Sequence, residues 1–168
     1  MSVPTLNTLP GATNSNSYCS LLEAEDYFDN HVYKDTWDVS DAEQQTRALL
    51  LATRLLDEHM LWNGDKVATT QALRFPRSGN LDRDGNDVSW TTIPKALINA
   101  TAEFASNLLI SDRTLEDDTR GYSKMRAGDL ELTINQSDRK QVIPESVSSM
   151  LSFLGRPKSK QSNKLTRC

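Results

Sequence analysis

Apolar residues recur every three or four positions in three segments of the chain, which is the spacing of one face of a helix. These segments predict helices over residues 21–33, 41–61 and 93–112. A capping box, Ser20–Glu23, precedes the first segment, and a second, Ser40–Glu43, precedes the longest one. The pattern predicts a mainly α protein, built as a small bundle of three to four helices.

Outside these segments the helical rhythm is lost. Residues 124–126 and 129–134 are short candidate strands that predict a β-strand or hairpin element, and 136–141 is a polar loop. The ends of the chain are polar and predict extended N- and C-terminal arms. The expected organisation is a flexible N-terminal arm at 1–17, a helical core at 18–112, a loop and β element at 113–143, a C-terminal helix at 144–155 and a basic arm at 156–168.

The charge of the chain is unevenly distributed. The net charge of its 168 residues is −4. The last 13 residues hold five of the 19 basic residues and none of the 23 acidic ones, so they carry +5 and the preceding 155 residues carry −9. The chain therefore has an acidic body and a basic C-terminal arm, whose cations are Arg156, Lys158, Lys160, Lys164 and Arg167.

Composition argues against several classes of protein. No stretch of 18 apolar residues predicts a membrane span, and the uncharged N-terminus lacks the apolar core of a signal peptide. The two cysteines, Cys19 and Cys168, lie at opposite ends of the chain and suit a reducing cytoplasm. Only two histidines are present, His31 and His59, which leaves little for zinc or triad chemistry.

Two constellations resemble catalytic or metal sites only in part. Residues 80–85 match the first half of a calcium loop, but Thr91 stands where a bidentate glutamate is needed, so a tight turn is favoured. Asp57 and His59 could form an acid/base set with His31, but side chains this close in a helix do not share a face. We therefore expect no catalytic, cofactor-binding or metal-ligating residues, and no enzyme.

Two segments remain as candidate contact sites. The basic arm could dock into an acidic crevice of a protein partner, remain a disordered tail, or contact phosphates; it lacks aromatic residues for base stacking. The loop at residues 71–79 contains Arg74, Phe75 and Arg77 and could be a binding loop. Its composition alone favours a simpler interpretation, in which Leu73 and Phe75 attach the loop to the helices and the arginines are solvated.

Several motifs together resemble the tailed-bacteriophage head–tail adaptor proteins, some of which carry a DnaT-like single-stranded-DNA-binding label. The resemblance covers about residues 16–110, and Phe75 stands where the family pattern has tryptophan. The motifs are Asn16–Tyr18, Ala24, Tyr27–Phe28, Ala52–Asp57, Trp62, Gly64, Gln71–Gly79, Asp84–Gly85, Ile93–Pro94, Ala100 and Glu103.

The resemblance implies a structural protein of the virion neck that is assembled in the host cytoplasm without a membrane. Such a protein forms a ring, expected to contain twelve copies, beneath the portal protein. The ring extends the DNA channel, through which packaged DNA passes without specific binding, and gives tail, stopper or nozzle proteins their attachment surface. The C-terminal arm is then the portal-docking segment. The alternative is a single-stranded-DNA-binding replication accessory protein that uses Arg74, Phe75, Arg77 and the basic arm.

Overall fold

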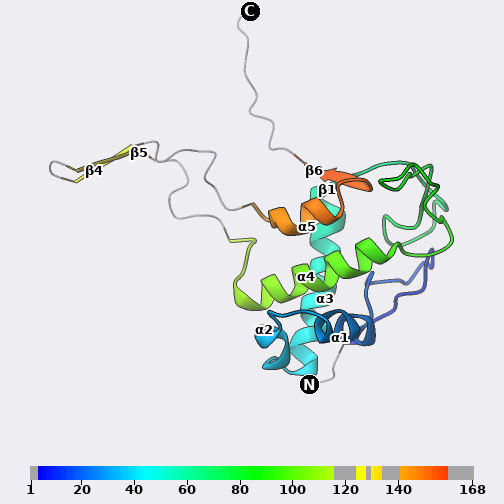
Figure 1. The fold of residues 1–168 in the computed structure, drawn as a ribbon, viewed down its shortest axis with the longest axis horizontal. Helices are drawn as coiled ribbons and strands as arrows, with labels where there is room; N and C mark the ends of the chain where they lie inside the picture. The colour runs from blue at the N-terminus through cyan, green and yellow to red at the C-terminus, as the bar shows by residue number, and fades with distance from the viewer. Residues whose placement is uncertain (1–3, 116–123, 128–129, 134–140, 159–168) are drawn as a thin grey trace, which may run out of the picture.

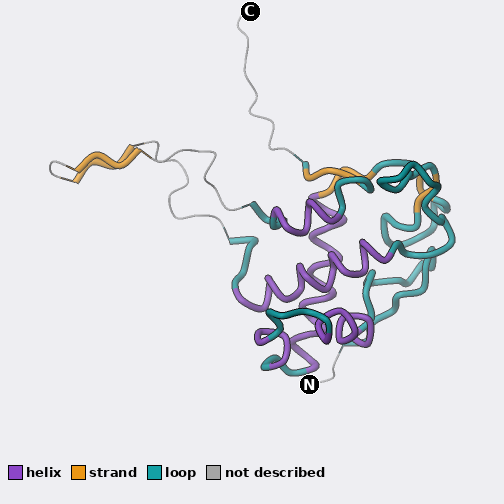
Figure 2. The backbone as a smooth tube through the Cα atoms, viewed as in Figure 1, coloured by secondary structure: helices purple, strands orange, loops and turns teal. Residues whose placement is uncertain are grey.

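The computed structural model describes residues 4–115, 124–127, 130–133 and 141–158. Two long helices, α3 and α4, cross at the centre of the molecule, and shorter helices flank them (Figure 1). Helices and short strands are joined by long loops (Figure 2), so the fold is mainly α with a short hairpin, as the sequence predicts. The helices are α1 (Leu21–Asp29), α2 (Asp35–Asp38), α3 (Ala42–His59), α4 (Lys95–Ile110) and α5 (Glu145–Met150).

The core lies where α3 and α4 pack against each other. Leu56 of α3 and Phe104 of α4 are fully buried, as the helical apolar spacing predicts. Val147 of α5 and Leu154 just beyond it are also fully buried in the same cluster. The core therefore extends past the predicted boundary at residue 112, because the C-terminal helix buries one face against α4.

The predicted helix boundaries need four corrections. The C-terminal helix, predicted over residues 144–155, is α5 and ends at Met150, and residues 151–154 form turns. Helix α1 ends at Asp29 rather than near Tyr33, because the ring of His31 bonds to the backbone of Tyr33 and competes with helical pairing. The N-cap of α3 is Asp41 and not Ser40; its carboxylate accepts from the backbone of Gln44, 2.8 Å away. Helix α3 stops at His59 because the next residues form a strand.

The prediction of a flexible N-terminal arm is wrong for residues 4–17. The backbone N–H of Asn7 donates to Asn16 Oδ1 at 2.7 Å, and the backbone N–H of Asn16 donates to the carbonyl of Asn7 at 2.9 Å. The backbone N–H of Ala72 donates to the carbonyl of Ala12 at 3.1 Å. Ser17 is buried. The polar residues that suggested a free arm instead satisfy the backbone of a folded segment, and this segment contacts the loop that follows α3.

The strand pairs in the described part of the chain are short and antiparallel. β1 (Met60–Trp62) pairs with β6 (Gly155–Pro157), β2 (Asp65–Lys66) with β3 (Arg77–Ser78), and β4 (Lys124–Ala127) with β5 (Leu130–Thr133). The last pair confirms the candidate strands at 124–126 and 129–134 to within a residue. The predicted polar loop at 136–141 lies almost entirely outside the described residues.

Strand β6 changes the predicted start of the basic arm. Arg156 pairs with Leu61, so the first part of the arm belongs to the folded body. Gly155 fits there because a Cβ atom would lie 2.6 Å from the carbonyl oxygen of Leu61. No helix in the described part of the chain is long and apolar enough to cross a membrane.

Candidate functional site

The loop at residues 63–80 is fastened to the body by one buried cluster. The hydroxyl of Tyr18 donates to Asp57 Oδ1 and accepts from the backbone N–H of Phe75 at 3.2 Å. The other carboxylate oxygen of Asp57 accepts from the backbone N–H of Arg74 at 3.0 Å. This staple joins the N-terminal segment, α3 and the loop, which are far apart in the sequence.

Burial sets the protonation behaviour of the staple. Burial raises the pKa of Asp57 above its usual range, although the hydrogen bonds from Tyr18 and Arg74 pull it down. Burial, together with the nearby carboxylate, raises the pKa of Tyr18, so the phenol stays a proton donor. The staple is a structural tie in which the pKa values of both titrating groups are raised, chiefly by burial.

Gln71 shapes the loop from inside. Its side-chain oxygen accepts from the backbone of Ala68 at 3.0 Å, and its amide nitrogen donates to the carbonyls of Leu73 and Pro76 at 3.0 and 3.1 Å. Phe75, joined to Pro76 by a cis peptide bond, is 2% exposed. The Gln71–Gly79 motif, one of those that carry the family resemblance, therefore encodes the conformation of this loop.

The three candidate contact residues of the loop lie in different environments. Phe75 packs edge-on against Tyr18 and Trp62, as the simpler interpretation of the loop predicts. Arg77 donates from its guanidinium to the carbonyls of Asn63, at 2.7 Å, and Gly64. Arg74 is exposed. Arg77 is half-buried and Phe75 is buried, so the loop presents no combined arginine and aromatic surface.

The basic arm leaves the body from a fixed point beside the end of α3. The backbone N–H of Lys158 donates to the carbonyl of His59 at 2.7 Å, and its ammonium group donates to the carbonyl of Glu58. Arg156 and Lys158 are both exposed. The other predicted docking residues, Lys160, Lys164 and Arg167, lie outside the described residues.

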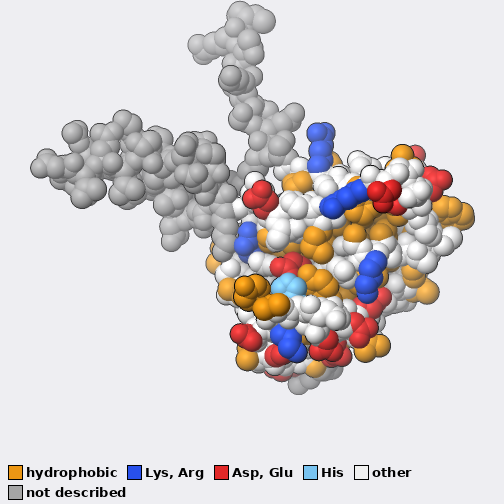
Figure 3. Space-filling model, viewed as in Figure 1, with side chains coloured by type: hydrophobic (Ala, Val, Ile, Leu, Met, Phe, Trp, Pro, Cys, Tyr) orange, Lys and Arg blue, Asp and Glu red, His pale blue; other side chains and the backbone are white. Residues whose placement is uncertain are grey.

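The opposite end of α3 is acidic. Residues 23–43, which form α1, α2 and the first turn of α3, contain eight acidic residues and one basic residue, Lys34. The ammonium group of Lys34 lies 3.6 Å from Asp29 and 3.3 Å from Asp38. Acidic side chains gather at this end of the surface in Figure 3. The body therefore has an acidic end and, across the length of α3, the end from which the basic arm departs.

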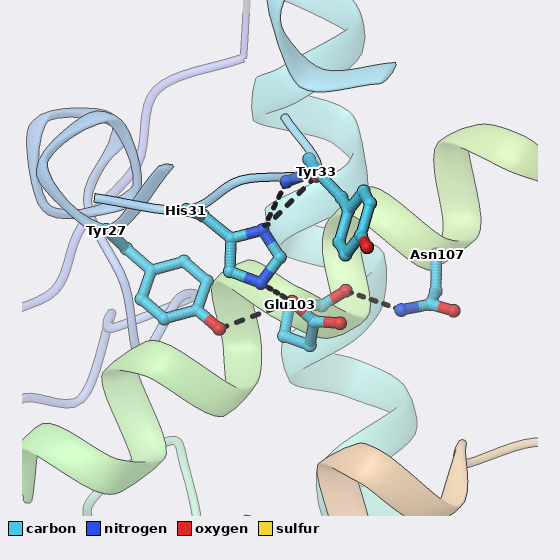
Figure 4. Close-up of polar contacts among 5 residues, drawn as sticks. All are labelled: Tyr27, His31, Tyr33, Glu103 and Asn107. Atoms are coloured by element: carbon cyan, nitrogen blue, oxygen red, sulfur yellow. Dashed lines mark hydrogen bonds and ion pairs between the residues drawn. The ribbon is translucent and has the colours of Figure 1, made fainter. Parts of the chain in front are cut away.

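A polar cluster ties the segment after α1 to α4 (Figure 4). The hydroxyl of Tyr27 donates to Glu103 Oε2 at 3.3 Å, and His31 Nε2 lies 3.8 Å from the same oxygen. Burial, followed by the charge of Glu103, raises the pKa of Tyr27 to about 12. The structure places His31 beside Glu103 rather than with Asp57 and His59, the set that helix geometry argued against. The four-residue spacing of Tyr27 and His31 within the helix predicted over residues 21–33 was the available signal.

The half-match to a calcium loop is a tight turn, as the sequence favours. The carboxylate of Asp82 accepts from the backbones of Asp84 and Asn86 at 2.9 and 2.8 Å, and Gly85 has a φ of 85°. Beside this turn lies an open hollow of about 420 Å³, lined in part by Asn99 and Phe153. Within the described ranges, no group of three or more His, Cys, Asp or Glu residues could hold a metal ion.

Comparison with known proteins places the chain in one family. Residues 6–168 match the model of the family described as "Putative DnaT-like ssDNA binding protein". The match spans nearly the whole chain, so the protein belongs to this family. No curated protein and no solved structure matches the chain.

Proposed function

We propose that this chain is a non-enzymatic structural adaptor of the neck of a tailed bacteriophage, which forms a ring beneath the portal and docks there through its basic arm. The observation that carries the proposal is the polarity of the body. An acidic end and an anchored basic arm lie at opposite ends of α3, whose 18 residues span about 27 Å. A subunit with this polarity can insert its arm into an acidic partner while its acidic surface faces DNA without holding it.

The contacts of the 63–80 loop also support a structural role. A subunit that bound single strands through this loop would present Phe75 for stacking and Arg77 for phosphates. Here Phe75 is buried and Arg77 is bonded to two backbone carbonyls. The resemblance of residues 16–110 to head–tail adaptors is a separate argument for the same role. The proposed partners are the portal, the tail, stopper or nozzle proteins, and further copies of this chain, within the virion.

The arm is tested by neutralising it without disturbing the body. We expect a chain with Lys160→Gln, Lys164→Gln and Arg167→Gln to stay folded but to bind the isolated portal ring about tenfold or more weakly, because the docking charges are lost. Cutting the chain after Lys158 should have the same effect and keeps β6, which a cut at residue 156 would remove. Co-sedimentation with portal rings, followed by electron microscopy, measures the binding.

The matched control removes the same charge elsewhere. Arg47 and Arg54 form exposed pairs with acids on the same helix, and Lys34 lies at the acidic end. Neutralising these three residues to glutamine should leave portal binding nearly unchanged. Full portal binding by the chain cut after Lys158 would show that the arm is not the docking element.

The family description favours a second candidate function, binding of single-stranded DNA by the arm and by the exposed Arg74. In that case the affinity for a labelled oligothymidine should fall linearly with salt on logarithmic axes, with a slope of about −0.7 per phosphate contacted. Fluorescence anisotropy across a salt series measures this slope. Absence of binding at low salt would reject this candidate and leave the adaptor proposal intact.

A further inference from the structure

Three large apolar side chains are exposed within one short segment of the acidic end. Val32, Tyr33 and Val39 are 84%, 83% and 84% exposed, and we call them the turn surface. They flank the single turn of α2, which lies at the opposite end of α3 from β1 and β6 (Figure 1). Single exposed apolar residues are ordinary, but three so close together indicate a surface that another molecule covers.

The segment that carries the turn surface is held in place by other residues. The buried ring of Trp37 stacks on Phe28, with the ring centroids 4.8 Å apart. The side-chain amide of Gln45 donates to the carbonyl of Trp37 at 2.9 Å. The backbone N–H of Tyr33 donates to Nδ1 of His31 at 3.2 Å. Because these contacts fix the segment, the exposed apolar side chains are not needed to attach it, and a partner meets a surface that is already ordered.

The charges around the turn surface select a basic partner. Asp35 and Asp38 of α2 are exposed, and the ammonium group of Lys34 is already paired with Asp38 at 3.3 Å. A cation binds favourably over the face of an exposed ring such as that of Tyr33. The long stems of arginine and lysine also cover apolar surface while their charges reach nearby carboxylates. The partner should therefore present exposed basic residues beside an apolar one.

The chain has a surface of this kind at the other end of α3. Leu61 lies directly opposite Arg156 in the register of β1 and β6, so their side chains share one face of the strand pair. Leu61 is 44% exposed, and Arg156 and Lys158 are exposed beside it. We call these three residues the basic edge. The adjacent acid, Glu58, pairs with Arg54 at 3.7 Å, so the edge keeps its positive charge.

We propose that the turn surface of one copy of this chain docks on the basic edge of the next copy. The contact joins two different surfaces, and such head-to-tail contacts close into a ring when the rotation between neighbours allows it. The inference rests on the proposed function for the need of a ring, and it identifies the surfaces that hold neighbours together. Glu25 and Asp26 of α1 are exposed outside this contact and can still face DNA, and the residues after Lys158 stay available to the portal.

Two variants, each blocked at one end, test the direction of the contact. The turn variant carries Tyr33→Ser and Val39→Ser, and the edge variant carries Arg156→Glu and Lys158→Glu. Each variant alone should self-associate about tenfold or more weakly than the unmodified chain, because one of its two surfaces is lost. An equimolar mixture should form a one-to-one heterodimer and nothing larger. The intact turn surface of the edge variant binds the intact basic edge of the turn variant, and both remaining surfaces are blocked.

The matched control removes exposed apolar side chains elsewhere. Leu81→Ser with Trp90→Ser should leave self-association unchanged, because both residues lie outside the two surfaces. Native mass spectrometry across a concentration series measures the assemblies, and circular dichroism checks that each variant keeps its helices. An unmodified chain that stays monomeric at every concentration would overturn the inference, as would a mixture of the two blocked variants that yields no heterodimer.

The assay contains no portal, so its outcome is separate from that of the portal-docking test. The chain cut after Lys158 keeps both the turn surface and the basic edge. It should self-associate as the full chain does even though it no longer binds the portal. Loss of self-association in this shortened chain would show that the residues after Lys158, and not the basic edge, hold neighbouring copies together.

Discussion

The Asp57→Ala variant should lose about 2–4 kcal/mol of unfolding free energy, because a buried hydroxyl donor and a backbone donor lose their shared acceptor. Tyr18 donates to one carboxylate oxygen and Arg74 to the other. Losing the carboxylate frees the 63–80 loop from α3. Urea denaturation followed by circular dichroism measures the change in free energy.

The neighbouring residue supplies the control. Glu58 is exposed, and its carboxylate forms a single surface pair with Arg54 at 3.7 Å. Glu58→Ala should therefore change the unfolding free energy by no more than about 0.5 kcal/mol. Tyr18→Phe removes the other half of the staple, so the double variant with Asp57→Ala should cost less than the two single changes summed. Similar losses for Asp57→Ala and Glu58→Ala would contradict the role of the staple.

The stability difference between the unmodified chain and Asp57→Ala should also depend on pH, and the direction of this dependence can be predicted. The pKa of Asp57 is raised in the folded protein, so the folded state binds its proton more tightly than the unfolded chain does. The stability advantage of the unmodified chain over Asp57→Ala should be largest below the unfolded pKa of about 4. It should shrink as the pH rises through the folded pKa. Taking the difference between the two chains cancels the other carboxylates. A stability advantage of the unmodified chain that grows with pH would contradict a raised pKa of Asp57 in the folded protein.

Local patterns in the sequence predict the helices well, because their signals lie within a few residues. The Ser20–Glu23 capping box forms as expected, and the three- and four-residue spacing identifies the buried faces of α3 and α4. The alternation around residue 130 likewise locates a strand. In each case the residues that decide the structure are close neighbours in the chain.

Features set by distant residues could not be predicted in this way. Residues 4–17 look like a polar arm until the loop after α3, with Ala72, provides their partner. Strand β1 exists because it pairs with β6, and a three-residue segment at the end of a helical pattern gives no local sign of this.

The same limit applies to the candidate site. Its composition identifies an arginine and aromatic loop, but the inward position of Phe75 depends on Tyr18, which is 57 residues away. Likewise, Glu103 accepts a hydrogen bond from Tyr27, which lies 76 residues away in the sequence. The charge division of the chain was visible at once. The sequence places the start of the basic arm after Gly155. In the structure Arg156 and Lys158 still belong to the folded body, so the arm begins after Lys158.

The Gly64→Ala variant should lose about 2–5 kcal/mol of unfolding free energy, from left-handed backbone strain and from a steric clash. Gly64 has a φ of 65°, and a Cβ atom would lie 2.1 Å from the carbonyl oxygen of Ser78. That oxygen belongs to the backbone of β3, which pairs with β2, so relief of the clash requires the two strands to separate. Arg77 would then lose its bond to the Gly64 carbonyl. Urea denaturation gives the loss in free energy, and amide hydrogen exchange over residues 63–80 locates it.

A second glycine in the same chain separates the strain from the clash. Gly85 has a φ of 85°, but nothing lies within 4 Å of the position that its Cβ would occupy. Gly85→Ala should therefore cost only the left-handed strain, about 1–2 kcal/mol, and leave hydrogen exchange over residues 63–80 unchanged. The difference between the two variants measures how tightly the loop is held against Gly64. Equal losses at the two positions would mean that the approach of Ser78 to Gly64 does not constrain the loop.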